Sequence, residues 1–288
     1  MPSHVRPVST NGQKTESCSV SVIVPTRNEA HNVGELTRRL VESMPLLGSR
    51  WELIFVDDSD DETPDRIRSL IHDTSVVKLI HRLPGERQGG LAGAVVEGFG
   101  AAQGSTIVVM DGDLQHPPEA VPVLAVPVLS GACSIAVGSR YVKSAHADGL
   151  AGPFRRSVSQ GSRVVVRSLF PAIWQVHDPL SGFFALQKSV VANSILAPKG
   201  FKILLEVLIR GHWDEVREIP YEFAARKNGG SKAGWHEGAQ LLQQLVRLRL
   251  PSAAALTGLS VQCEGSSSAR RPLPNGVTVL SVGDVSPS

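Results

Sequence analysis

Two acidic clusters are the parts of this sequence best suited to chemistry. The first is the run from Asp57 to Glu62, and the second is Asp111-Gly112-Asp113, which is followed by Leu114-Gln115-His116-Pro117. Carboxylates this close repel one another, so we expect a cation between them, and oxygen-only ligands suit Mg²⁺ or Mn²⁺. In an Asp-x-Asp arrangement the two carboxylates can bracket one ion, and the central glycine has no side chain to block a further ligand. The pattern favours a site for a metal and a diphosphate, and the alternative is a solvated acidic loop.

Each acidic cluster directly follows a segment that we expect to be a buried strand. Apolar, β-branched runs predict strands at Ser19–Pro25, Trp51–Val56, Val76–Ile80 and Thr106–Met110, and periodic apolar residues predict helices at 29–44, Pro64–His72 and Leu91–Ala102. This alternation predicts a single α/β domain with a mostly parallel central sheet flanked by helices. Ligands bind at the carboxyl ends of the strands in such sheets, which is where both clusters lie.

The stretch Ala120–Gly138 carries no charge and is long enough to span a membrane. Pro122 and Pro127 interrupt it, so we expect a helix, a turn and then a strand at Ser134–Val137, with Pro127 kinking or shortening the helix. No transmembrane segment is expected, and the first sixteen residues lack the apolar core of a signal peptide.

Composition and missing motifs narrow the function further. The chain has 288 residues, 42% of them hydrophobic, and a net charge of +2, which predicts a folded protein that binds no nucleic acid. Its three cysteines are widely spaced, so we expect no disulfide framework. The sequence has no P-loop, no Gly-x-Gly-x-x-Gly turn, no His-Glu-x-x-His and no Gly-x-Ser-x-Gly elbow. We expect disordered tails at 1–16 and 251–288 around one catalytic domain at 17–250.

Six segments, in the same order along the chain, resemble the inverting family-2-type glycosyltransferases with an A-type fold, and among them the polyprenol- or dolichol-phosphate mannosyltransferases. They are Val24–Glu29, Val56–Ser59, Met110–Pro117, Gly138–Tyr141, Asp178–Phe184 and Arg226–Lys232, and the resemblance covers about residues 19–250. Two positions depart from the family pattern. Arg27 stands where many members carry Tyr, which leaves the base preference open, and Glu62 stands where Gly is common.

The resemblance implies roles for individual residues. It places Pro25, Arg27 and Glu29 around the base and ribose, and Asp58, beside Val56, on the nucleoside. It implies that Asp111, Asp113 and Gln115 bind the metal and, with Gly112, the diphosphate. It matches Arg155, Arg226 and Lys232 to basic residues that stabilise the leaving diphosphate, and the implied catalytic residues are Asp113, Arg226 and Lys232. The alternatives are a helix surface for Arg155 and an ordinary surface turn for the Gly-Gly-Ser-Lys stretch.

The activity implied by the resemblance is transfer of a hexose, with mannose from GDP-mannose expected, to a polyprenyl or dolichyl phosphate with inversion. A phosphate monoester is already ionised near neutral pH, so its attack needs no protein base. The metal and cationic side chains would stabilise the departing diphosphate. The alternatives are a glucosyl- or N-acetylhexosaminyltransferase to a lipid phosphate, a glycan-extending transferase, and a non-catalytic nucleotide-binding subunit.

The acceptor's hydrocarbon chain must stay in lipid, so we expect a cytoplasmic protein that acts peripherally at the cytoplasmic face of a membrane. Residues 236–250 predict a helix with Leu241, Leu242, Leu245 and Leu248 on one face, and with Arg247 and Arg249 near its end. This helix could lie at the membrane interface. Its leucines could equally pack on the domain's own core, in which case a separate membrane-anchoring protein is expected.

Two further acidic residues have roles that the sequence leaves open or assigns to structure. Asp178 could orient a sugar hydroxyl or the acceptor, or it could cap the turn that follows. Glu206 lies on an apolar helical stretch, so we expect a buried structural partner for an arginine there rather than a catalytic group.

Overall fold

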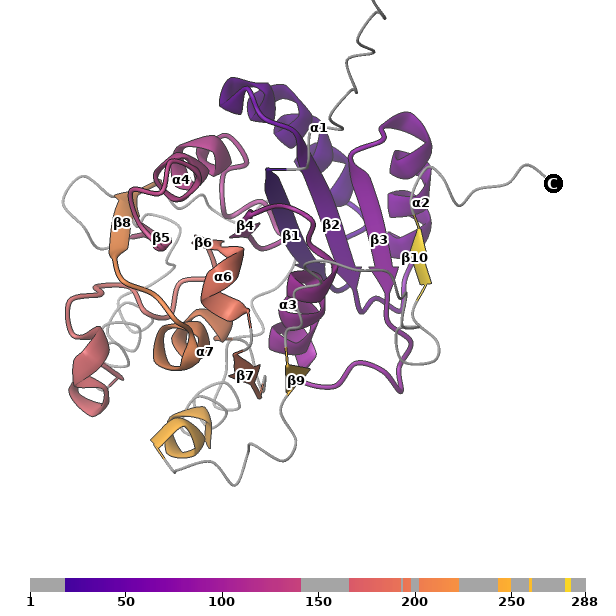
Figure 1. Ribbon diagram of the computed structural model, residues 1–288. Coiled ribbons are helices and arrows are strands. Elements are labelled where there is room, and N and C mark those ends of the chain that lie inside the picture. Colours follow the sequence, from indigo (N-terminus) through magenta and orange to yellow (C-terminus); the bar gives the residue numbers. More distant parts are fainter. Residues whose placement is uncertain are drawn as a thin grey trace, which may run out of the picture.

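The computed structural model describes residues 19–140, 166–192, 194–197, 202–222 and 243–249, together with two short strands at 259–260 and 278–280. Its centre is an eight-stranded sheet in the order β10-β3-β2-β1-β4-β6-β5-β8 (Figure 1). These strands are β1 (Val20–Thr26), β2 (Trp51–Asp57), β3 (Val77–His81), β4 (Thr106–Val109), β5 (Ile135–Ser139), β6 (Phe184–Gln187), β8 (Val216–Pro220) and β10 (Thr278–Leu280). A second sheet pairs β7 (Ile195–Leu196) with β9 (Leu259–Ser260).

The central sheet is mostly parallel, as the alternating sequence pattern predicts. Strands β3, β2, β1 and β4 are parallel neighbours, and β5 runs parallel to β8. Strand β6 is antiparallel to both β4 and β5, and β10 is antiparallel to β3. The four strands predicted from apolar runs are all present, and their ends differ from the predicted ones by at most one residue. Strands β9 and β10 belong to the segment 251–288, for which the sequence indicated no regular structure.

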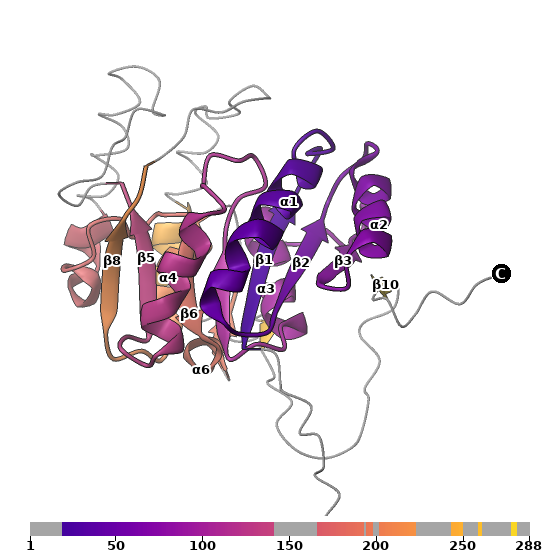
Figure 2. The ribbon, with the colours of Figure 1, turned by 90° about the horizontal axis from the view of Figure 1, so that it is seen from above.

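Helices cover both faces of this sheet (Figure 2). They are α1 (Val33–Ser43), α2 (Thr63–Asp73), α3 (Gly90–Ala101), α4 (Ala120–Leu129), α6 (Lys188–Val191) and α7 (Ile203–Arg210), with 3-10 turns η1 (Met44–Leu47) and η2 (Pro171–Ile173). Helices α1, α2 and α4 share one buried apolar cluster with Val22 and Val24, whereas α3 and α7 share the other with Ile23. Successive residues of a strand point to opposite faces, so β1 contributes to both cores.

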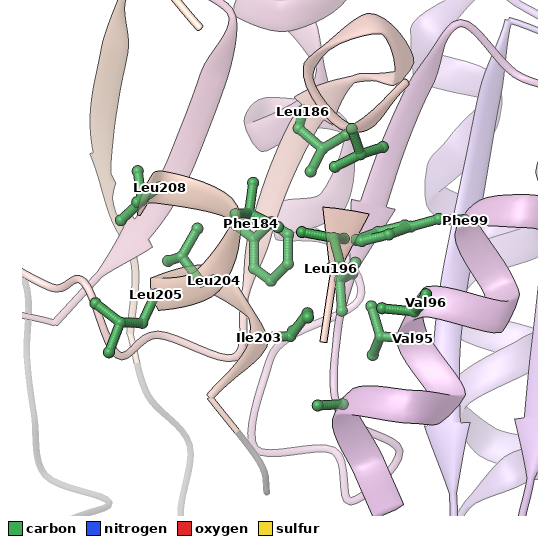
Figure 3. Packing of buried hydrophobic residues seen from close by; sticks show 14 of the residues in the cluster. Val95, Val96, Phe99, Phe184, Leu186, Leu196, Ile203, Leu204, Leu205 and Leu208 are labelled. Atoms are coloured by element: carbon green, nitrogen blue, oxygen red, sulfur yellow. The ribbon is translucent and has the colours of Figure 1, made fainter. Parts of the chain in front are cut away.

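The core beneath α3 and α7 joins the two halves of the chain. Phe99 of α3, Phe184 of β6 and Leu204 of α7 all belong to this core (Figure 3). Glu206 on α7 is also buried, accepts the Ala197 N–H at 2.5 Å, and lies 3.5 Å from the Arg210 guanidinium. The prediction that Glu206 is a structural partner for an arginine is therefore confirmed.

The uncharged stretch after the second acidic cluster forms α4 and β5, as predicted. Helix α4 contains both Pro122 and Pro127 and ends at Leu129, two residues beyond the second proline. Pro122 lies in the first turn, where a missing backbone N–H breaks no helical hydrogen bond. Within the described ranges, no helix has both the length and the apolar composition that crossing a membrane requires.

Residues 243–249 of the predicted last helix are helical and pack on the domain. Leu245 is buried in the core beneath α3 and α7, and Leu248 packs against the same core. The Gln244 side chain donates to the Lys202 carbonyl at 2.9 Å. These contacts support the core-packing alternative for Leu245 and Leu248, while Leu241 and Leu242 lie outside the described residues.

Candidate active site

Three loops meet at the carboxyl edge of the parallel strands. They follow β1, β2 and β4, and they carry Arg27–Glu29, Asp58–Glu62 and Asp111–Gln115. The Asn28 N–H donates to the Ser59 hydroxyl at 2.8 Å, and the Asn28 side-chain carbonyl accepts the Asp60 N–H at 3.1 Å. Asn28 has a φ of 61°, a left-handed conformation that asparagine tolerates better than most residues. These hydrogen bonds hold the loop after β1 and the loop after β2 together before any ligand binds.

Gly112 lies against the loop that follows β1. A methyl group added at this position would come within 3.1 Å of the Thr26 methyl carbon and 3.6 Å of Cγ of Glu29. A larger residue would therefore push the second acidic loop away from the β1 loop. The predicted role of Gly112 was to leave room for a ligand, and the structure gives close packing between the loops as a further reason for glycine.

Asp57, the first acid of the first cluster, is a structural residue. Its side chain is fully buried and accepts hydrogen bonds from the hydroxyls of Thr26 at 2.7 Å and Ser59 at 2.6 Å. Its other oxygen pairs with Nδ1 of His81 at 2.8 Å. These contacts tie together the ends of β1, β2 and β3, so this carboxylate holds the edge of the sheet in place.

Asp58, the predicted nucleoside-binding acid, forms a buried ion pair with Arg82. The Arg82 guanidinium donates to the two carboxylate oxygens at 2.7 and 2.6 Å, and its side chain is only 2% exposed. It also donates to the carbonyls of Gln88 at 3.3 Å and Gly90 at 2.9 Å. Sequence reasoning missed Arg82, whose only signal was its position one residue after a predicted strand at the same sheet edge.

The residues predicted to surround the base and ribose lie on β1, on β2 and in the loop that follows β1. Pro25 and Val56 are register partners on β1 and β2, and both are buried. The Glu29 carboxylate accepts a hydrogen bond from the Asn32 side chain at 2.6 Å, which fixes its orientation. Arg27 is largely exposed, and its guanidinium is 4.0 Å from the Asp60 carboxylate.

The Asp-x-Asp loop follows β4 directly. The Asp111 side chain is 39% exposed, whereas Asp113 is buried and accepts the Gln115 N–H at 3.1 Å. The Asp111 N–H in turn donates to Nδ1 of His116 at 3.1 Å. Burial lowers the pKa of His116 to about 3, so at neutral pH its imidazole is uncharged and can accept that bond. The loop conformation is thus fixed by hydrogen bonds that leave one carboxylate facing solvent.

The segment from His177 to Phe183 packs against the Asp-x-Asp loop. A methyl group at Gly182 would lie 3.0 Å from one carboxylate oxygen of Asp111 and 3.3 Å from the other. The Phe183 ring stacks on His116, with centroids 5.1 Å apart. Glycine suits position 182 because the backbone approaches the Asp111 carboxylate closely there. The backbone conformation of Gly182 does not itself require glycine.

Asp178 in this segment holds an arginine at the same edge. It is fully buried, and Arg140, which follows β5, donates to its two oxygens at 3.0 and 3.2 Å. Glu218 on β8 accepts the backbone N–H groups of His177 and Asp178, both at 2.9 Å. Asp178 therefore orients Arg140, which belongs to the Gly138–Tyr141 segment and was not among the predicted site residues.

The donor set fits a divalent metal only if substrate supplies further ligands. Among the described residues, no three His, Cys, Asp or Glu side chains are grouped as a metal site. Asp111 and Asp113 offer carboxylate oxygens from one short loop, and the exposed face of Asp111 can be reached from solvent. Such a pair suits Mg²⁺ or Mn²⁺ that is shared with diphosphate oxygens. Arg155, Arg226 and Lys232, the other predicted site residues, lie outside the described part of the chain.

Comparison with known proteins finds relatives of this chain. Residues 21–189 match the family model described as glycosyl transferase family 2. The dolichol-phosphate mannosyltransferase of Pyrococcus furiosus is 42% identical over 80% of this chain, which spans 63% of that relative's length. The Saccharomyces cerevisiae dolichol-phosphate mannosyltransferase is 38% identical over 81% of this chain and 87% of its own length.

The fold itself is shared with a solved glycosyltransferase. The glucosyl-3-phosphoglycerate synthase of Mycobacterium tuberculosis, in a structure containing Mn²⁺ and UDP-glucose, superposes with a TM-score of 0.59 over 84% of this chain and 86% of its own. The sequence identity is 21%, so the likeness establishes the A-type architecture that the sequence predicts.

Proposed function

This chain belongs to glycosyltransferase family 2, and we propose that it transfers mannose from GDP-mannose to a polyprenyl or dolichyl phosphate with inversion. The observation that carries the proposal is the Asp111–Asp113 loop, held at the carboxyl edge of the sheet between the nucleoside-side pair Asp58–Arg82 and the phosphate-side cation Arg140. The two mannosyltransferase relatives, at 42% and 38% identity, support the choice of sugar and acceptor.

Different residues would bind the nucleoside, the metal and the diphosphate of the donor. Asp58, fixed by Arg82, and Glu29, fixed by Asn32, face the nucleoside side. Asp111, Asp113 and Gln115 would hold Mg²⁺ or Mn²⁺, which supplies positive charge for the departing diphosphate. Arg140, and by resemblance Arg155, Arg226 and Lys232, would add cationic donors around the same phosphates, where developing negative charge is strongest.

The reaction needs little acid–base chemistry from the protein. An oxygen of the ionised acceptor phosphate attacks the anomeric carbon as the bond to the nucleoside diphosphate breaks on the opposite face. The main tasks of the side chains are therefore to orient the donor, exclude water and stabilise the leaving group. No described residue has to remove a proton from the acceptor.

The membrane contact remains part of the proposal. The protein would reach a membrane-held acceptor from the cytoplasmic face. Because Leu245 and Leu248 pack on the core, we place the attachment on a separate membrane-anchoring protein rather than on these leucines.

Turnover with a panel of donors tests the proposed function. GDP-mannose, UDP-glucose and UDP-N-acetylglucosamine would each be supplied with a polyprenyl phosphate, with Mg²⁺, Mn²⁺ or excess chelator. We expect transfer from GDP-mannose only, loss of transfer in chelator, and loss in Asp113→Ala. Asp65→Ala, which removes an exposed acid on α2, is the matched control and should stay active. A UDP-sugar preference would replace mannose by the glucosyl or N-acetylhexosaminyl alternative, and full activity in chelator would rule out the metal site.

A further inference from the structure

An apolar pocket of about 270 Å³ lies at the same sheet edge, between α4 and the ends of β5 and β8. Its walls include Ala120, Val123 and Leu124 of α4, Phe183, and Ile219 and Tyr221 at the end of β8. The pocket adjoins the Asp-x-Asp loop through two contacts. Pro117 lines it, and the Phe183 wall stacks on His116, which accepts the Asp111 N–H.

The chemistry of the walls selects an apolar ligand. Among the described residues of the lining, Glu222 is the only charged one, and none is a lysine or arginine. From these described walls a phosphate would receive no cationic partner and a sugar few partners for its hydroxyls, whereas a hydrocarbon needs only apolar contact. The pocket is also small compared with the roughly 300–1,000 Å³ of a typical small-molecule site. It suits a short piece of hydrocarbon rather than a whole ligand.

An apolar surface continues from this pocket along α4. None of the ten residues of the helix is polar, and Val123 and Val126 on its outer side are 59% and 52% exposed. A helix of a soluble domain normally presents polar residues to water. These exposed apolar side chains offer a surface to a ligand that extends beyond the pocket.

We infer that this pocket binds the first isoprene units of the acceptor's hydrocarbon chain and that the chain leaves along the outer face of α4. The inference rests on the proposed function, because it names the part of the acceptor next to the reacting phosphate. The phosphate would then sit at the Asp-x-Asp loop while its apolar tail turns into the pocket. This arrangement would let the enzyme distinguish a polyprenyl phosphate from a phosphate that lacks a hydrocarbon chain.

Two variants test the pocket, one at its wall and one at its mouth. Ala120→Phe fills it, and Val123→Glu places a charge at a position that is already exposed. Val41→Glu, at an exposed apolar position on α1, is the matched control. Steady-state kinetics would use GDP-mannose and a detergent-dispersed polyprenyl phosphate, alongside calorimetric GDP binding and thermal melting. We expect the KM for the acceptor to rise about tenfold or more in both pocket variants, with GDP affinity and melting unchanged.

The outcomes separate this inference from the proposed function. If the wild type forms a lipid-linked sugar and both pocket variants keep its acceptor KM, the inference is overturned and the proposed function stands. If the variants lower the melting temperature and leave KM unchanged, a segment of the protein itself fills the pocket, which also overturns the inference. If the wild type binds GDP-mannose but transfers to no polyprenyl phosphate, the proposed function fails and the inference fails with it.

Discussion

The ion pair between Arg82 and Asp58 should make Arg82→Met strongly destabilising. The side chains are 2% and 8% exposed, and the guanidinium reaches both carboxylate oxygens at 2.6–2.7 Å. Methionine keeps most of the apolar stem, so little packing is lost. The substitution leaves the buried Asp58 carboxylate without its two N–H donors. It also removes the guanidinium N–H groups that the backbone carbonyls of Gln88 and Gly90 accept.

The size of the effect follows from this geometry. Removing one partner of a buried ion pair costs about 3–5 kcal/mol, whereas breaking an exposed pair costs about 0–1 kcal/mol. A domain of this kind is stable by only about 5–15 kcal/mol, so Arg82→Met should remove a large share of the total. Arg82→Lys keeps the charge but loses the two-pronged geometry, and we expect an intermediate loss.

Urea unfolding at neutral pH measures these differences. Arg66→Met, which breaks an exposed pair on α2, is the matched control and should change the free energy of unfolding by less than about 1 kcal/mol. Combining Arg82→Met with Asp58→Asn should restore part of the lost stability, because the uncompensated charge is gone. The reasoning is refuted if Arg82→Met behaves like the control, or if the two substitutions add without coupling.

Three further substitutions test other parts of the account. Gly182→Ala should displace the Asp111 carboxylate, and it should therefore weaken Mn²⁺-dependent activity more at limiting than at saturating metal. The control Gly34→Ala should have no effect, because a methyl group there meets nothing within 4 Å. Glu218→Gln should lower kcat and leave the donor KM nearly unchanged, because the amide keeps only one acceptor oxygen for the two backbone N–H groups of His177 and Asp178. An unchanged kcat would refute this. Burial raises the pKa of Glu206, so stability should fall as pH rises from the unfolded value of 4.5 through the folded pKa. Glu206→Gln should therefore gain stability over wild type at pH 7 and lose that advantage at pH 4 in urea titrations, and equal stability at both pH values would contradict the assignment.

Much of the fold could be predicted from the sequence because its strands and helices have clear local patterns. The β-branched run before Pro25 and the uncharged strand before Asp111 both required burial on two faces, which implies a parallel sheet. The antiparallel strand β6 was not predicted. Its pairing with β4 joins residues about 80 positions apart, and the local sequence Phe184–Gln187 does not indicate which strand it pairs with.

The candidate site was only partly predictable for a similar reason. Motif spacing indicated Asp58, Asp111 and Asp113 because acidic residues that directly follow predicted strands can be recognised in the sequence alone. Arg82 and Glu218 were missed because their roles depend on contacts between distant segments, and a single arginine or glutamate is usually a surface residue. Arg82 is distinguished by its burial, and Glu218 by a side chain that is only 9% exposed.

The anomeric configuration of the lipid-linked product shows whether mannose is transferred to the lipid phosphate with inversion. GDP-mannose carries mannose in the α configuration, so a single displacement at the anomeric carbon must give the β-linked mannosyl phosphate. The product formed from GDP-mannose and a polyprenyl phosphate would be isolated, and its configuration determined from the one-bond carbon–hydrogen coupling at the anomeric carbon. We predict a β-linked product that is absent with chelator and with Asp113→Ala. An α-linked product, or mannose found on a glycan with none on the lipid phosphate, would contradict the account.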